Sequence, residues 1–374
     1  MDIYNSYMEV DLNEIGRNID KIRNGIGPGV DIIAVLKANA YGLGLNAIGT
    51  FLTESCGINI LACAQAFEAV SLREANIKKD IFILGGVPYH NIPAVVAYDI
   101  QTVAYNSVYL SLLDEEAGRQ NKKAAVQIKI ETGFNRLGVL PGEETEHLCQ
   151  HLKTLKNVKV VGIYTHFIQS ELEDKGLCYQ QYALFKEALT QVKAHNFELK
   201  YIHVCNSAAT TWFSAPEMTH VRPAGLLFGF DYNIEPVNKF ALNEVVSWKT
   251  FVTNVKTVSA GANVGYNGRF IASKPTTVAI ASIGYGDGYN RTLAMSGKAE
   301  MIINGRRALV IGICMDQVFL DVTGIPVKIN DTVTIAGKDG GEFISLFELK
   351  RKMGQTFLSI LTVIPERVKR IYLQ

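Results

Sequence analysis

Four polar side chains lie at or beside the ends of apolar runs in the first two thirds of the chain. Lys37 ends the run 32–37, His166 lies near the end of the run 160–167, Ser207 follows the run 201–205, and Arg222 opens the run 221–228. Amines, imidazoles, hydroxyls and guanidinium groups can transfer protons, form covalent intermediates or bind anions. A lone lysine at a strand end is usually solvated. Four polar residues of different types at strand ends indicate a functional site if the strands form a barrel and these ends meet at one mouth of it.

A second lysine falls inside an apolar strand. In the segment 126–131 the apolar residues alternate, so Lys129 and Glu131 share the other face, which points inward if the strand belongs to a barrel. A buried lysine is costly unless it is paired or neutralised, and Arg136 adds a second cation nearby. Two interpretations follow: a structural pair of Lys129 with Glu131, or a chemically modified lysine.

The runs that carry these residues alternate with amphipathic segments. Helical spacing is found at 66–73, 108–119 and 179–195, and Ile15, Ile19 and Ile22 are spaced as on one helix face ahead of the first run. This alternation predicts an α/β fold, with a closed (β/α)8 barrel of the TIM type over residues 1–238. Chemistry in such barrels lies at the carboxyl ends of the strands. The eight expected strands are 32–37, 60–64, 81–84, 102–105, 126–130, 160–167, 201–205 and 221–228.

The pattern changes after residue 238. Strand-like runs now follow one another without long helical segments, and Asn304-Gly305 between two of them is a strong hairpin signal. Asp-Gly pairs at 287–288 and 339–340 mark further turns. We expect a mostly antiparallel β domain over residues 239–374. Its strands are expected at 245–258, 276–284, 299–303, 307–322 and 332–336.

Composition excludes several classes of partner. The formal net charge is +1, which does not indicate a nucleic acid or an anionic membrane as a binding partner. No apolar run reaches the roughly 18 residues of a membrane span, and the first residues lack the features of a signal peptide, so a cytoplasmic protein is expected. The six cysteines form no CxxC pair, which favours reduced thiols over a zinc or redox motif, and no metal is expected.

Seven segments together resemble the alanine racemase family. AVLKANAYGLG (34–44) is similar to that family's lysine signature, and KIETGFNRLG (129–138) is similar to its K-x-D-T-G-M-x-R-L-G motif. Five further motifs occur in the family's order: GIYTHF, HVCNSAA, GYNGRF, IGYGDGY and ICMDQ. The resemblance as a whole extends from about residue 10 to about residue 335. The family fold, a barrel followed by a β domain, agrees with the fold predicted from the pattern of runs.

The resemblance implies an amino-acid racemase that uses pyridoxal 5′-phosphate (PLP). Lys37 would hold PLP covalently and act as the base on the D face of the substrate, while Tyr266 would act on the L face. His166 would belong to the polar network that tunes this tyrosine. Arg222, supported by His203, would face the pyridine nitrogen. The residues expected at the phosphate are Tyr41, Ser207 and the backbone amides near Ala224 and Gly225.

The resemblance also implies a shared active site. Tyr266 lies in the second domain, and in the family a partner subunit supplies it, so a homodimer is expected. The substrate is a small amino acid, with Arg136 and the backbone of Met315 at its carboxylate and Tyr285 at the entrance. By the electrostatic argument above, we expect Lys129 to be carbamylated. The implied reaction interconverts L- and D-alanine and supplies a D-amino acid for cell-wall synthesis.

The chain also departs from the family pattern. Leu43 replaces the usual histidine of A-Y-G-H-G, and the strand-eight motif reads RPAGLLFG (222–229) in place of R-P-G-I-x-x-Y-G. Leu358 stands where a tyrosine usually contacts the phosphate and narrows the pocket. These differences keep open a racemase for serine or for a broader range of amino acids. A PLP barrel decarboxylase and a non-catalytic PLP-binding protein are the alternatives from other classes; Arg222 and Tyr266 favour the racemase, and the second domain argues against the binding protein.

Overall fold

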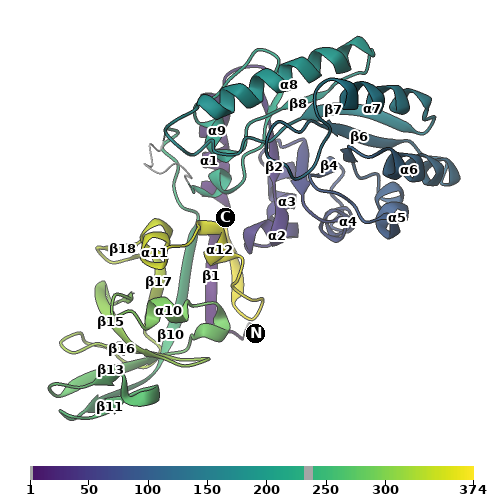
Figure 1. The fold of residues 1–374 in the computed structure, drawn as a ribbon. Helices are drawn as coiled ribbons and strands as arrows, with labels where there is room; N and C mark the ends of the chain where they lie inside the picture. The colour runs from purple at the N-terminus through teal and green to yellow at the C-terminus, as the bar shows by residue number, and fades with distance from the viewer. Residues whose placement is uncertain (1–2, 231–238) are drawn as a thin grey trace. The chain divides into compact units, whose positions relative to one another are not determined.

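The computed structural model of the chain describes residues 3–230 and 239–374 (Figure 1). The chain divides into a barrel unit, residues 16–40 and 44–242, and a β unit, residues 1–15, 41–43 and 243–374. The boundary expected at 238/239 adjoins the segment 231–238, which lies outside the described residues. The units differ from the expected division because the N-terminal segment up to Ile15 belongs with the β unit.

The barrel unit contains eight parallel strands close to the expected positions. The run 221–228, expected as one strand, is extended only at its start, in His220–Val221, and forms a single 3-10 turn at Gly225–Phe228. The eight strands form two four-stranded sheets, ordered β4-β3-β2-β9 and β5-β6-β7-β8. A parallel bridge between Phe82 and Gln101 joins the sheets on one side, and on the other the Thr219 N–H donates to the Ile202 carbonyl at 3.0 Å. The barrel is therefore closed, which confirms the predicted fold class. The strands are β2 Asp31–Val35, β3 Ile60–Cys63, β4 Asp80–Ile83, β5 Thr102–Ala104, β6 Ala124–Lys129, β7 Val158–Tyr164, β8 Tyr201–His203 and β9 His220–Val221.

Helices connect these strands and cover the outside of the barrel (Figure 1). The segments with helical spacing are helices, and Ile15, Ile19 and Ile22 on α1 are all fully buried, as one apolar helix face requires. Within the described part of the chain, no helix is long and apolar enough to cross a bilayer. The helices are α1 Leu12–Ile26, α3 Leu45–Glu54, α4 Ala66–Glu74, α5 Ile92–Ala97, α6 Ser107–Arg119, α7 Glu143–Thr154, α8 Gly176–Ala194 and α9 Ser207–Thr210, with single turns η1 Tyr89–Asn91 and η2 Gly225–Phe228.

The β unit is built on one nine-stranded sheet, ordered β18-β17-β14-β15-β16-β13-β10-β1-β19. An additional pairing of β17 with β10 closes six of these strands into a small barrel. Strand β1 pairs antiparallel with β10 and parallel with β19, and Figure 1 shows it beside the long β10. The strands are β1 Ser6–Asp11, β10 Val246–Val258, β13 Thr276–Ala281, β14 Glu300–Ile303, β15 Arg306–Ile313, β16 Val318–Asp321, β17 Thr332–Asp339, β18 Glu342–Ile344 and β19 Lys369–Leu373.

One hairpin turn of this unit lies where the sequence predicts it, and a second turn lies inside a run that was expected to be a single strand. Asn304 (φ 48°) and Gly305 (φ 71°) connect β14 to β15 with the positive φ values of a tight hairpin. The run 307–322 was expected as one strand but is two, β15 and β16, because the chain reverses at residues 314–317. The short elements are β11 Asn263–Val264, η3 Tyr266–Gly268, β12 Phe270–Ile271, η4 Tyr285–Asp287, α10 Arg291–Ala294, α11 Leu346–Met353 and α12 Phe357–Leu361.

Candidate active site

Lys37 lies two residues beyond β2, at the carboxyl end of the barrel strands. The preceding Leu36 N–H donates to the Ala62 carbonyl at 2.7 Å and extends the pairing with β3 to the edge of the barrel. The pKa of the Lys37 amine is lowered from 10.5, first because the surrounding protein desolvates its charge and second because Arg136 repels it, while Glu68 opposes the shift. A lowered pKa increases the neutral, nucleophilic fraction of the amine.

The chain turns in a left-handed helical conformation directly after this lysine. The segment α2, Lys37–Tyr41, has φ values of 53°, 57°, 50° and 57° at residues 38, 39, 40 and 41. Left-handed helical backbone costs an L-residue roughly 1–2 kcal/mol, so four consecutive residues of this kind need support from outside the turn. Strain of this sort is typical of functional sites.

Glu68 supplies that support. Its side chain is 2% exposed, and one carboxylate oxygen accepts hydrogen bonds from the Ala38 N–H at 2.5 Å and the Asn39 N–H at 3.4 Å. The other oxygen accepts from the Ala64 and Gln65 N–H groups at 3.0 and 3.1 Å. Charge-assisted bonds to backbone amides are strong, so Glu68 ties the turn after Lys37 to the end of β3. Glu68 was not predicted from the sequence as a site residue, although its position three residues after Gln65 is the spacing of a capping box.

Arg222 and two histidines form the buried polar centre of the barrel unit. The Arg222 side chain donates through one nitrogen to His203 Nδ1 at 2.5 Å and through the other to the Thr165 carbonyl at 2.7 Å, with His166 Nδ1 at 3.3 Å. Burial lowers the pKa of Arg222 to about 10, so the guanidinium stays charged at neutral pH. Burial, followed by repulsion from Arg222, lowers the pKa of both histidines well below 6.5, so both are neutral.

The residues expected at a phosphate fall into two groups. Ser207 begins α9, and its Oγ accepts a hydrogen bond from the Ala224 N–H at 2.8 Å. Because the oxygen already accepts, the hydroxyl hydrogen is directed elsewhere and can serve an anion. The structure thus brings together Ser207, Ala224 and the adjacent Gly225 in the barrel unit, whereas Tyr41 is buried and belongs to the β unit.

Lys129 is buried without a carboxylate partner at hydrogen-bond distance in the described chain. It is 4% exposed, and its Nζ donates to the Ile130 carbonyl at 2.6 Å. Burial lowers the Lys129 pKa to about 7, and Arg222 and Arg136 push it in the same direction against the attraction of Glu131. Glu131 instead accepts backbone N–H groups, including that of Gly133 at 2.6 Å. The contacts therefore do not support a hydrogen-bonded Lys129–Glu131 pair.

Arg136 lies on the loop that follows this strand. Its side chain is exposed, and the guanidinium carbon lies 4.1 Å from the ring centroid of Phe134, a cation–π distance. The Phe134 ring in turn meets His166 edge to face, with centroids 5.3 Å apart. Arg136 thus lies near enough to lower the pKa values of Lys37, Lys129 and His166 while its guanidinium remains accessible.

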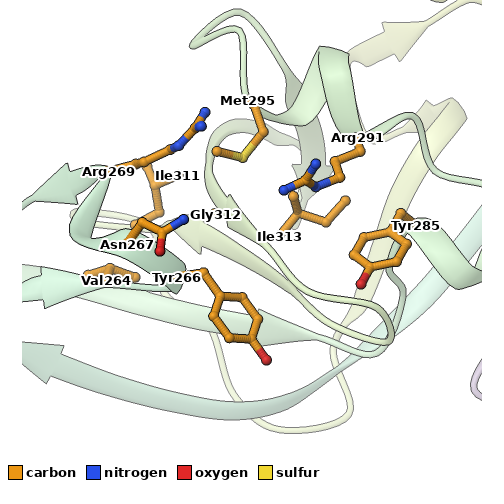
Figure 2. Close-up of a pocket in the computed structure, with 10 residues that line it drawn as sticks. All are labelled: Val264, Tyr266, Asn267, Arg269, Tyr285, Arg291, Met295, Ile311, Gly312 and Ile313. Carbon is orange, nitrogen blue, oxygen red and sulfur yellow. The ribbon is translucent and has the colours of Figure 1, made fainter.

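Two of the predicted tyrosines line one pocket of about 450 Å³ in the β unit. Figure 2 shows Tyr266 and Tyr285 projecting to the same side of this pocket, with Arg269 and Arg291 among its other lining residues. Tyr266 is 73% exposed and Tyr285 40% exposed. The Met315 carbonyl accepts from the Gly286 N–H at 2.8 Å, so the loop carrying Met315 holds the turn that carries Tyr285.

Comparison with known proteins adds to this geometry. Residues 10–231 match the family described as "Alanine racemase, N-terminal domain", and residues 245–372 match "Alanine racemase, C-terminal domain". An alanine racemase of Methanococcus maripaludis is 35% identical over 371 residues, covering 98% of each chain. One of Clostridium perfringens is 36% identical, covering 98% of this chain and 95% of that one.

Solved structures of alanine racemases have the same fold as this chain over its length. The alanine racemase of Clostridium difficile 630 superposes with a TM-score of 0.92 at 26% identity and covers 100% of this chain and 97% of its own. The alanine racemase of Bacillus anthracis, crystallised with bound L-Ala-P, gives a TM-score of 0.92 at 28% identity, covering 100% and 96%.

Proposed function

This chain belongs to the alanine racemase family, and on that premise we propose that it is a PLP-dependent isomerase that interconverts L-alanine and D-alanine. The observation that carries the proposal is the amine of Lys37, with its lowered pKa, at the carboxyl end of a barrel that also holds the buried cation Arg222. Both domains of the family are matched, which supports a second base, Tyr266, in the second domain of the chain.

The residues of the barrel unit fit PLP. Lys37 would bind it covalently, and Ser207 with the amides of Ala224 and Gly225 would bind its phosphate, with Tyr41 added by resemblance. When bound, PLP withdraws electrons and acidifies the α-carbon of an amino acid. Arg222 would lie at the ring nitrogen; because its pKa is about 10, it donates a hydrogen bond without giving up a proton. It thereby limits electron withdrawal and disfavours side reactions.

Two bases would then exchange the α-proton from opposite faces of the substrate. Lys37 serves one face and Tyr266 the other, while Arg136, Met315 and Tyr285 bind or admit the amino acid. A phenol of ordinary pKa, about 10, is a weak base unless its surroundings favour the anion, and in the family His166 contributes to that tuning.

We further propose a cytoplasmic homodimer with shared sites that provides D-alanine for the cell wall. The exposure of Tyr266 and of Met315, at 73% and 53%, supports a surface that a second copy covers. The six cysteines of the described chain are all free thiols, as in a reducing compartment.

A racemase assay tests the proposal directly. The purified chain, loaded with PLP, should convert L-alanine to D-alanine and the reverse, measured by chiral chromatography, with the two rates consistent with an equilibrium constant of one. Binding of PLP without racemisation of any amino acid would favour a binding protein, and release of carbon dioxide would favour a decarboxylase.

The first prediction concerns substrate range. Leu358 stands on α12, and this helix lies against Gly42, where a Cβ atom would be 2.5 Å from the Leu361 carbonyl oxygen. If Leu358 leaves room that a tyrosine usually fills, the wild type should racemise at least one amino acid larger than alanine, such as serine. One methylene in a pocket is discriminated by about 1–3 kcal/mol, or roughly 10- to 200-fold. Leu358→Tyr should therefore raise the preference for alanine by a factor in that range.

The measurement is kcat/KM for L-alanine, L-serine and one longer amino acid in both proteins. Val363→Tyr is a matched control, because it adds a tyrosine at a 59% exposed position just beyond the same helix. An unchanged ratio of alanine to serine in Leu358→Tyr would show that this position does not set specificity.

The second prediction is that Lys129 is carbamylated. A neutral amine attacks the carbon of CO2 and loses one proton, which leaves a carbamate anion. With a pKa of about 7, Lys129 is about half neutral at pH 7, whereas an ordinary lysine is almost wholly charged. The carbamate would turn repulsion from Arg136 and Arg222 into attraction. Its occupancy should fall as the pH drops below 7, because the amine protonates.

Carbon-13 NMR of the chain equilibrated with labelled bicarbonate should show a carbamate resonance at pH 8 that weakens towards pH 6. Lys129→Met, which keeps an unbranched side chain of similar length and removes the amine, should lack the resonance. A signal that persists in this variant would place the modification elsewhere, and no signal in the wild type would refute it.

A further inference from the structure

A continuous row of hydrogen-bonded side chains crosses the interior of the barrel unit, and the mechanism above uses only its first member, Arg222. Arg222 donates to His203 Nδ1 at 2.5 Å, and His203 Nε2 lies 2.7 Å from Gln127 Oε1. Gln127 Nε2 donates to Gln101 Oε1 at 2.8 Å, and the Gln101 side chain lies near enough to the Asp80 carboxylate to lower its pKa through hydrogen bonding. The row begins near the carboxyl ends of the strands and reaches Asp80 at the amino end of β4.

The two ends determine the direction of every bond between them. A guanidinium only donates, and an ionised carboxylate only accepts. Asp80 is ionised at neutral pH: burial acts to raise its pKa, but hydrogen bonds from Lys200, Tyr201 and Gln101 outweigh that effect and lower it. Gln101 must therefore donate its N–H to Asp80 and present its oxygen to Gln127. By the same logic Gln127 presents its oxygen to His203, whose hydrogen must be on Nε2.

The packing leaves these groups little freedom to turn. Gln127 and His203 are fully buried, and the Tyr164 ring stacks on His203 with centroids 5.0 Å apart and planes at 17°. Gly162 leaves the space that the amide occupies, because a Cβ atom there would lie 3.0 Å from Gln127 Oε1. A buried amide that loses a hydrogen-bond partner in such surroundings is destabilising, so the loss of one bond in the row favours reorientation of the remaining amides.

We propose that Gln101 and Gln127 are positioning residues that fix the His203 tautomer from the far end of the barrel and thereby hold Arg222 in place. With its hydrogen on Nε2, His203 offers the Nδ1 lone pair that accepts from Arg222. With the hydrogen on Nδ1, two donors would face each other and Arg222 would shift. The effect on racemisation rests on the proposed function, whereas the tautomer of His203 can be observed without it.

The test breaks the row at a residue remote from Arg222. Nitrogen-15 NMR of the full-length chain, with and without PLP, should show wild-type His203 as a single neutral tautomer protonated on Nε2. Gln101→Met leaves Gln127 free to turn its amide, so His203 should become a mixture of tautomers. The value of kcat for L-alanine should fall about three- to tenfold, as expected for one neutral hydrogen bond, with KM unchanged. A single unchanged tautomer in this variant would overturn the proposal.

Tyr201→Phe is the matched control, because it removes another donor to the same Asp80 carboxylate without interrupting the row. It should leave the His203 tautomer and kcat unchanged; a tautomer mixture here would show that general disturbance of Asp80, and not the row, is responsible. If cofactor-free Gln101→Met shifts the tautomer but the wild type does not racemise alanine, the proposed function fails while the positioning role stands.

A second variant covers the case in which Gln101→Met does not fold. Gln127→Glu places a carboxylate beside His203 Nε2. In the wild type, the titratable groups that act on this imidazole are Arg222, which meets Nδ1, together with His220 and Lys129. The carboxylate should raise the pKa of His203, so that the imidazole charges on acidification and can no longer accept from Arg222. A new loss of kcat below about pH 6.5, together with the NMR signature of the imidazolium, is expected. A His203 that titrates as in the wild type would contradict the proposal.

Discussion

Replacing Lys37 with alanine should abolish both covalent cofactor binding and racemisation. The amine at residue 37 is the group whose lowered pKa and position beyond β2 suit covalent binding of PLP, and it also serves as one of the two proposed bases. Loss of a nucleophile and a base together should reduce kcat on the order of 10^4-fold or more. The change removes no buried group of the core, so the barrel should remain folded.

Borohydride reduction followed by peptide mass spectrometry measures the covalent link, and chiral chromatography measures the rate. Lys78→Ala is the matched control, because Lys78 is an exposed lysine outside the site, and its removal should leave both readouts unchanged. If the Lys37→Ala variant still formed a reducible adduct at another lysine, the assignment of the cofactor to Lys37 would be wrong.

Tyr266→Phe should nearly eliminate racemisation while leaving the covalent cofactor intact. The substitution removes one hydroxyl from a side chain that is 73% exposed, so no effect on stability is expected. Removal of a general base costs about 10^2- to 10^4-fold in rate. Tyr285→Phe is the comparison, since it makes the same chemical change in the same pocket. It should reduce the racemisation rate far less than Tyr266→Phe does. Equal turnover of Tyr266→Phe and wild type in both directions would rule out the second base.

A mixing experiment separates a shared site from one built within a single chain. If each site uses Lys37 of one subunit and Tyr266 of the other, a mixed dimer of Lys37→Ala and Tyr266→Phe chains contains one intact site. Random reassociation makes half of the dimers mixed, so about a quarter of the wild-type activity should return. Verified mixed dimers without activity would argue that the tyrosine acts within its own chain.

Local patterns predicted most of the fold. Apolar runs predicted the positions of the eight barrel strands, and helical spacing predicted helices α1, α4, α6 and α8, because both patterns depend on short-range periodicity. The segment 314–317 was missed as a turn because Cys-Met-Asp-Gln carries no glycine or asparagine signal. Strand β1 was not assigned to the β unit because its partners, β10 and β19, lie more than 200 residues away in the sequence.

The residues of the candidate site likewise divide into those that local sequence patterns predicted and those that they did not. Lys37, Arg222 and Tyr266 stood out because each lies in a motif with family resemblance. Glu68 and Gln101 did not, because their roles depend on contacts with residues distant in the sequence, and a glutamate or glutamine at such positions has many ordinary uses. Positive φ at two alanines in α2 was not predictable either, because alanine has no intrinsic preference for it.

The left-handed turn after Lys37 has a consequence for how natural selection and protein engineering act on this chain. Four residues at roughly 1–2 kcal/mol each store strain comparable with the 5–15 kcal/mol by which a whole domain is usually folded. A sequence optimised for thermostability alone would place glycine or asparagine at such positions, but here two are alanine and one is tyrosine. Consensus or computational stabilisation would flag this segment as an error to repair, and the repair would loosen the backbone next to the reactive amine.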